Sequence, residues 1–228
     1  MRILHRSAVT ALFIMISTAA ARGDSLLVGN LANAPFGSDA VDAADARAQG
    51  FKTGGRDWNL TSIEAVLGGF NPGGTFAVSA VLAASTTNAL GKDVPDVSSP
   101  LATFLVPTID ASFATLNFTP TTNFVLKANT EYWFVLTVTA AGGTPFEWQY
   151  TYDTAIDSAS EGILTSAAAT IPPGSGVWVS QPNAPYMIQV MGTPVGAVPE
   201  PSSWIIGGLG FSSVFMLVRR RRSAPVAG

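Results

Sequence analysis

Carboxylates are the side chains that could do chemistry in most of this chain. Its 228 residues include no cysteine and one histidine, His5, close to the N-terminus. Beyond that segment no Ser-His-Asp or Cys-His pair can form. Zinc, haem and iron–sulfur sites likewise lack a thiolate or imidazole ligand. What remains is a pair of acids, as in glycoside hydrolysis, or calcium bound through oxygen ligands.

Two glutamates in strand-like segments are candidates for an acid pair. Glu131 and Glu147 could face a common groove, and their separation would then decide whether they can act on a glycosidic bond. A strand glutamate that alternates with apolar residues more often faces solvent. We therefore expect two solvated carboxylates and keep a carboxylate-dependent glycoside hydrolase as a distant alternative.

The aspartates offer a second possibility, a calcium site. Asp39, Asp42 and Asp45 recur at every third residue. Calcium could gather them, but the EF-hand pattern has alternate ligands, a central glycine and a terminal glutamate. A solvated acidic loop is the favoured interpretation, and the same holds for Asp93 and Asp96. No cofactor is predicted, with calcium as the alternative.

Aromatic residues could form a platform for a sugar ring. Phe146, Trp148, Tyr150 and Tyr152 alternate with polar residues and share one face of a predicted strand. Stacking on carbohydrate is one interpretation, but strand aromatics usually point into the core, which we favour. The core is also the expected place for three further tryptophans, at positions 58, 133 and 178.

The most specific motif lies at the C-terminus. Val198, Pro199, Glu200 and Pro201 precede 17 uncharged residues, 202–218, which are followed by Arg219, Arg220, Arg221 and Arg222. At about 1.5 Å per residue the apolar segment spans roughly 25 Å, the short end of a membrane span. A basic cluster beside such a span stays on the cytoplasmic side. We therefore expect a single transmembrane helix followed by a cytoplasmic tail, residues 223–228.

These three parts, in this order, resemble the PEP-CTERM sorting signal of Gram-negative bacteria. The resemblance places the sorting and anchor segment at residues 198–222. It implies that the chain is the substrate of an exosortase-type processing enzyme. The precursor would be held in the inner membrane and then reach the cell surface or extracellular matrix. An ordinary single-span anchor is the alternative.

The N-terminus agrees with export. Arg2, His5 and Arg6 form a basic region, residues 8–16 are apolar, and the alanines at 19–21 are small enough for cleavage after position 21. This pattern is typical of a secretory signal peptide, residues 1–21. The functional part is then an ectodomain, residues 22–197, which is one domain by its length.

The charge of the exported part excludes one class of partner. Residues 22–201 contain all 15 acidic residues but only six of the 12 basic ones, which gives a net charge of −9. A surface this acidic repels phosphate backbones, so we expect no nucleic-acid binding.

Strand-like alternation predicts the fold class. Eight or nine short segments rich in Val, Phe, Tyr, Trp and Thr are separated by Gly, Pro and Asn, with the clearest at 60–67, 76–82, 131–139 and 146–152. They predict an all-β, two-sheet, jelly-roll-like sandwich. The exception is 39–49, which we expect to be a short helix or an ordered loop.

The ectodomain also resembles the choice-of-anchor R family of exported β-domains. The segments that carry this likeness are FKTGG at 51–55, NTEYWFVL at 129–136 and PYMIQV at 185–190. The resemblance implies a β-domain outside the cell and supplies no reaction. We therefore expect a non-enzymatic structural or adhesion protein of the surface, matrix or biofilm. The alternative is a carbohydrate-binding module that engages exopolysaccharide.

Overall fold

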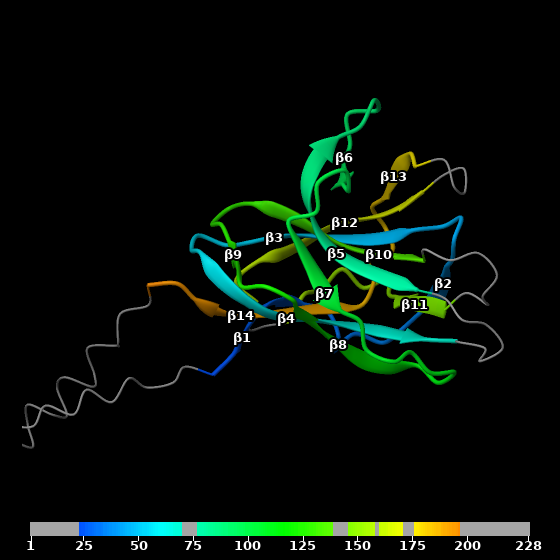
Figure 1. Cartoon of the computed structure of the whole chain (residues 1–228), viewed down its shortest axis with the longest axis horizontal. Coiled ribbons are helices and arrows are strands. Elements are labelled where there is room, and N and C mark those ends of the chain that lie inside the picture. The colour runs from blue at the N-terminus through cyan, green and yellow to red at the C-terminus, as the bar shows by residue number, and fades with distance from the viewer. Residues whose placement is uncertain (1–22, 70–76, 139–145, 158–159, 171–175, 197–228) are drawn as a thin grey trace, which may run out of the picture.

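Antiparallel β-structure makes up the described part of the chain. The computed structural model describes residues 23–69, 77–138, 146–157, 160–170 and 176–196 (Figure 1). Within these ranges no helix is long and apolar enough to cross a membrane. The signal helix expected at 1–21 and the span expected at 202–218 lie outside them. The strands are β1 (Ser25–Gly29), β2 (Gly37–Val41), β3 (Arg47–Lys52), β4 (Trp58–Gly68), β5 (Val78–Thr87), β6 (Asp93–Asp96), β7 (Ala102–Leu105), β8 (Ala114–Pro120), β9 (Phe124–Leu126), β10 (Glu131–Val138), β11 (Phe146–Tyr150), β12 (Ile163–Thr170), β13 (Trp178–Gln181) and β14 (Ile188–Pro194).

The described strands form one continuous sheet. Its main path runs β1-β14-β4-β8-β7-β5-β10-β3-β12-β13, with β2, β6, β9 and β11 branching from it. The all-β prediction is confirmed. Two separate sheets, as expected for a sandwich, are not seen, because β7 pairs with β5 through Thr103 and with β8 through Phe104 and Leu105.

The sheet folds over so that distant strands enclose one core. Phe134 of β10 lies against Phe104 of β7, Phe118 of β8 and Trp148 of β11, with ring centroids 5.3, 5.1 and 5.8 Å apart and near edge-to-face geometry. All four side chains belong to one buried cluster. Aromatic pairs in this geometry stabilise a core beyond their buried area.

Backbone hydrogen bonds also join the two far ends of the sheet. The Gly29 carbonyl of β1 accepts from Asp157 N at 2.8 Å, and the Leu27 carbonyl accepts from Glu161 N and Gly162 N at 2.8 and 2.9 Å. The segment that leads into β12 therefore covers the free edge of β1. An edge covered in this way is protected from pairing with another chain.

Strand β10 is buried on both faces. Its residues Tyr132 to Leu136 are all buried. Phe134 faces the main core, whereas Trp133 and Val135 pack with Val94 and Trp178 in a second cluster on the outer face. This outer cluster exists because β6 and β13 contact each other and β6 also contacts β10. Figure 1 shows β6 and β13 next to each other at the top of the view.

The segment 39–49 was expected to be a helix or loop and is mostly strand. It contains most of β2, a turn at 42–46 and the start of β3. Its alanines favour a helix locally, but β2 pairs with β11, and β3 pairs with β10 and β12. These tertiary pairings outweigh the local preference. Asp93 and Asp96, which were also expected in a loop, are the first and last residues of β6.

Asn30 provides a test of how the edge of the sheet is held. Its fully buried side chain donates from Nδ2 to the Tyr186 carbonyl at 3.2 Å, and its Oδ1 accepts from Ile188 N at 2.9 Å. Asn30→Ala leaves both backbone groups unpaired, so the free energy of unfolding should fall by about 2–4 kcal/mol. Urea denaturation followed by tryptophan fluorescence measures this. The matched control, Asn117→Ala at an exposed position of β8, should change it by less than about 0.5 kcal/mol. Equal effects of the two variants would contradict the role given to Asn30.

Candidate functional site

The aromatic strand is split between the core and the surface. Phe146 and Trp148 are fully buried, whereas Tyr150 is half-buried and Tyr152 is 54% exposed. Trp148 stacks on Tyr186 with ring centroids 4.6 Å apart, and its indole nitrogen donates to the Met187 carbonyl at 3.2 Å. The four aromatics therefore do not form one exposed platform. The tryptophans at 58, 133 and 178 are also buried, in agreement with the core interpretation.

A smaller aromatic patch remains at the surface. Phe36 is 64% exposed. The centroid of its ring lies 4.1 Å from the ring centroid of Tyr152 and 6.2 Å from that of Tyr150. The Phe36 backbone nitrogen also donates to the Tyr150 carbonyl at 2.9 Å. Gly37 makes this approach possible, because a Cβ there would lie 2.7 Å from the Tyr150 hydroxyl oxygen. Phe36 could not be identified from the sequence, because only the pairing of β2 with β11 brings it to this patch.

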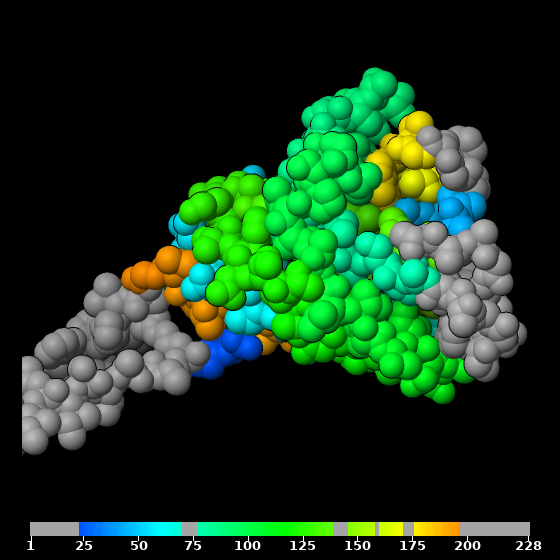
Figure 2. Space-filling model, viewed as in Figure 1, coloured from blue at the N-terminus to red at the C-terminus, as the bar shows by residue number. Residues whose placement is uncertain are grey.

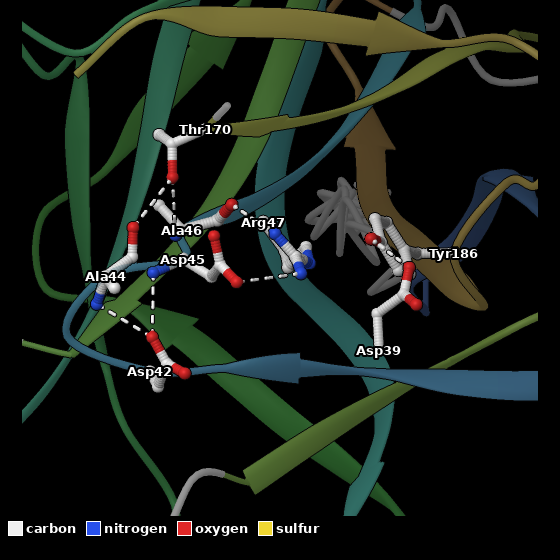
Figure 3. Close-up of polar contacts among 8 residues, drawn as sticks. All are labelled: Asp39, Asp42, Ala44, Asp45, Ala46, Arg47, Thr170 and Tyr186. Carbon is white, nitrogen blue, oxygen red and sulfur yellow. Dashed lines mark hydrogen bonds and ion pairs between the residues drawn. The ribbon is translucent and has the colours of Figure 1, made fainter. Parts of the chain in front are cut away.

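Two of the three regularly spaced aspartates build a turn (Figure 3). Asp42 Oδ1 accepts from Ala44 N at 2.7 Å and from Asp45 N at 2.8 Å, which closes the turn between β2 and β3. Asp45 contacts Arg47 at 3.5 Å. Thr170 supports the same turn by donating to the Ala44 carbonyl and accepting from Ala46 N, both at 3.1 Å.

The third aspartate, Asp39, has a separate partner. Its carboxylate accepts from the Tyr186 hydroxyl at 2.7 Å (Figure 3). Burial of Tyr186, and then the negative charge of Asp39, hold the pKa of this phenol far above its ordinary value, so it stays a donor. Among the described residues no group of three or more His, Cys, Asp or Glu side chains is placed to hold a metal ion. The three aspartates thus lie in two separate arrangements, one that closes a turn and one that pairs with Tyr186.

The two strand glutamates and Asp96 each have a serine partner of their own. Glu131 accepts from the Ser85 hydroxyl at 2.8 Å, and Glu147 accepts from the Ser38 hydroxyl. Asp96 accepts from the side chain and backbone of Ser98, and these bonds lower the pKa of its carboxyl group. Glu131 lines a polar cavity of about 530 Å³ that does not include Glu147. The two glutamates predicted as a possible acid pair thus do not share this cavity.

That polar cavity is the feature that sequence reasoning missed. Asp93 was considered only as part of a loop, yet it lines the cavity together with Lys92, Glu131 and hydroxyl-bearing residues of β12 and β13. Apart from Lys92, which precedes β6, these residues come from β6, β10, β12 and β13, of which only β12 and β13 are neighbours in the sequence. Only the order of strands in the sheet could have indicated that they meet.

The residues proposed to direct sorting lie outside the described ranges. They are Val198, Pro199, Glu200 and Pro201, with Arg219, Arg220, Arg221 and Arg222 as the membrane stop. Comparison with curated proteins gave no match to the chain. Comparison with family models matched residues 197–222 to the PEP-CTERM protein-sorting motif. The chain therefore carries a PEP-CTERM sorting motif at its C-terminal end, which implies an exported protein whose membrane-anchored precursor is processed by an exosortase.

Proposed function

We propose that this protein is delivered by the exosortase route to the cell surface or extracellular matrix, where its ectodomain has a structural or adhesive role without catalysis. The observation that carries the proposal is the match of residues 197–222 to the sorting motif. The matched segment contains all three parts of the signal in order: Val198 to Pro201, the apolar residues 202–218, and the four arginines. A signal peptide at residues 1–21 would supply the export step.

The ectodomain supports a stable, passive role. Its described strands form one sheet whose β1 edge is covered by backbone hydrogen bonds, which disfavours uncontrolled pairing with other chains. The resemblance of segments 51–55, 129–136 and 185–190 to choice-of-anchor R domains favours the same extracellular setting. The proposal includes that the protein is a component of the extracellular matrix or biofilm.

Carbohydrate binding is the second candidate function. The observation that favours it is the exposed pair Phe36 and Tyr152, because two aromatic rings at a surface can stack on a sugar ring. Exopolysaccharide would be the partner. A glycoside hydrolase ranks third, because Glu131 and Glu147 do not line a common cavity among those described.

Of two predictions on sorting, the first concerns Glu200. Proline lacks a backbone donor, and a residue before proline favours the extended region, so we expect the motif to be open to the processing enzyme. Glu200 is the sole charge between Glu161 and Arg219. We expect Glu200→Ala to leave the ectodomain folded and to block processing, so that the uncleaved precursor accumulates in the inner membrane. Mass spectrometry of the C-terminal peptide in membrane and surface fractions measures this.

Glu161→Ala is the matched control. Glu161 is an acidic residue of the ectodomain that pairs with Arg56 at 2.8 Å on a partly exposed surface. Loss of such a pair has little effect on stability, so this variant should be processed like the wild type. Normal processing of Glu200→Ala would overturn the sorting role of that residue.

The second prediction concerns the four arginines. Replacing Arg219 to Arg222 with glutamine removes the charges that keep this end of a span on the cytoplasmic side. We expect weaker retention in the inner membrane, mixed orientation and less processed protein. Protease accessibility of a C-terminal tag in intact cells reports the orientation. If the quadruple variant is oriented and processed like the wild type, the arginines are not the membrane stop.

A further inference from the structure

The polar cavity lies where two free edges of the sheet approach each other. The edge strand β6 branches from β5, and β13 lies beyond β12, yet β6 and β13 contact one another. Figure 2 shows their two segments side by side at one end of the molecule. Asn88 Nδ2 donates to the Trp178 carbonyl at 3.3 Å and so links the two edges. The cavity of about 530 Å³ is within the usual size range of small-molecule sites.

A bulge in β12 supplies two of its hydroxyl groups. The register of β12 against β3 passes from Leu164 opposite Phe51 to Ala167 opposite Gln49. Thr165 and Ser166 are the irregular residues, and both line the cavity. Bulges commonly occur next to functional sites because they redirect side chains. Gly50 makes room for this one, since a Cβ at position 50 would overlap Thr165 Oγ1.

Thr165 has hydrogen-bonding capacity that the protein does not use. Its Oγ1 is buried and has no hydrogen-bond partner in the described part of the chain. Buried polar side-chain atoms nearly always have a partner. Oγ1 lies against Gly50 and out of contact with solvent, so the side chain must turn about χ1 toward the cavity, which it lines, before a ligand can become its partner.

The carboxylate of Glu131 is oriented by a chain of hydrogen bonds to the outer core. Its Oε2 accepts from the Ser85 hydroxyl at 2.8 Å, and Ser85 in turn accepts from the Trp133 indole nitrogen at 3.2 Å. Trp133 is fully buried, so this chain of hydrogen bonds anchors the carboxylate to the outer core. One carboxylate oxygen is thereby used internally, and the other, which has no hydrogen bond to the described residues, can accept from a ligand.

The charges and hydroxyls of the cavity select one kind of ligand. Two carboxylates, Asp93 and Glu131, face one cation, Lys92, so an anion is disfavoured. Hydroxyls from Thr165, Ser166 and Ser180 make the lining unsuitable for an apolar molecule. A neutral ring that carries several hydroxyl groups can donate to the carboxylates and accept from the serines, threonine and lysine.

We propose that this cavity binds a neutral sugar unit of a polysaccharide. The site is distinct from the patch formed by Phe36 and Tyr152, and it concerns the second candidate function rather than the sorting route. Glu131 and Thr165 are assigned as the residues that hold the sugar hydroxyls, and Lys92 and Asp93 lie on the exposed side of the cavity.

The test is a binding measurement on the full chain. The protein is purified from the membrane in a zwitterionic detergent without a sugar headgroup, because glycosidic detergents would compete. Glucose, galactose, mannose and N-acetylglucosamine are titrated by calorimetry, with glucuronate and inorganic phosphate as anionic comparators. We expect at least one neutral sugar to bind at least about tenfold more tightly than either anion.

Two isosteric variants then locate the site. Glu131→Gln and Thr165→Val each remove a hydrogen-bonding function without changing volume, and each should weaken binding by about tenfold or more. The controls are Glu64→Gln on β4 and Thr115→Val on exposed β8, both outside the cavity, which should bind like the wild type. Thermal unfolding of each variant shows that it is folded.

The outcomes separate this proposal from the others. Loss of binding in the cavity variants alone supports it. Absence of binding by all four sugars overturns it, as does preference for an anion, or loss only in Phe36→Ala and Tyr152→Ala. Mass spectrometry of the C-terminus in the membrane and surface fractions of the producing cells reads the sorting route independently, so one proposal can fail while the other stands.

Discussion

The double-sided burial of β10 is the constraint on which most of this structure depends. Five consecutive buried side chains, Tyr132 to Leu136, need apolar partners on both faces of the sheet. Phe134 packs in the main core. Trp133 points to the outer face of the sheet and would be exposed to water if no other strand covered it. Strands β6 and β13 supply that cover through Val94 and Trp178. Because two edges must come together above one strand, a polar cavity forms where they meet.

The ends of the sheet are held in place without disulfide bonds. It contains no cysteine, so the ends of the sheet are fixed by hydrogen bonds and packing alone. Asn30 shows how this works, because one buried amide replaces ladder bonds where β1 ends beside β14. A domain of this length can bury enough apolar surface for such a solution. The aromatic contacts around Phe134 then join strands that do not pair directly.

Sequence reasoning succeeded where the signal is local and periodic. Strands such as β4, β10 and β14 alternate or are strongly apolar, and the sorting motif is contiguous, so both could be predicted without a structure. Strand β12 was missed because its residues Ala167 to Ala169 are small and all buried, which gives no alternation. Segment 39–49 was misassigned because its alanines favour a helix locally. The cavity and the patch at Phe36 could not be predicted, since each depends on pairing between strands far apart in the chain.

The position of β14 determines how this domain would carry mechanical load. β14 is the last described strand before the sorting motif, and it lies between β1 and β4, antiparallel to both. Tension applied through a C-terminal tether acts along the strand, perpendicular to its interstrand hydrogen bonds. Both ladders are then loaded in shear, and many bonds must break together before β14 can slide out. A domain fastened in this way resists being pulled apart far better than one whose terminal strand can be peeled from an open edge.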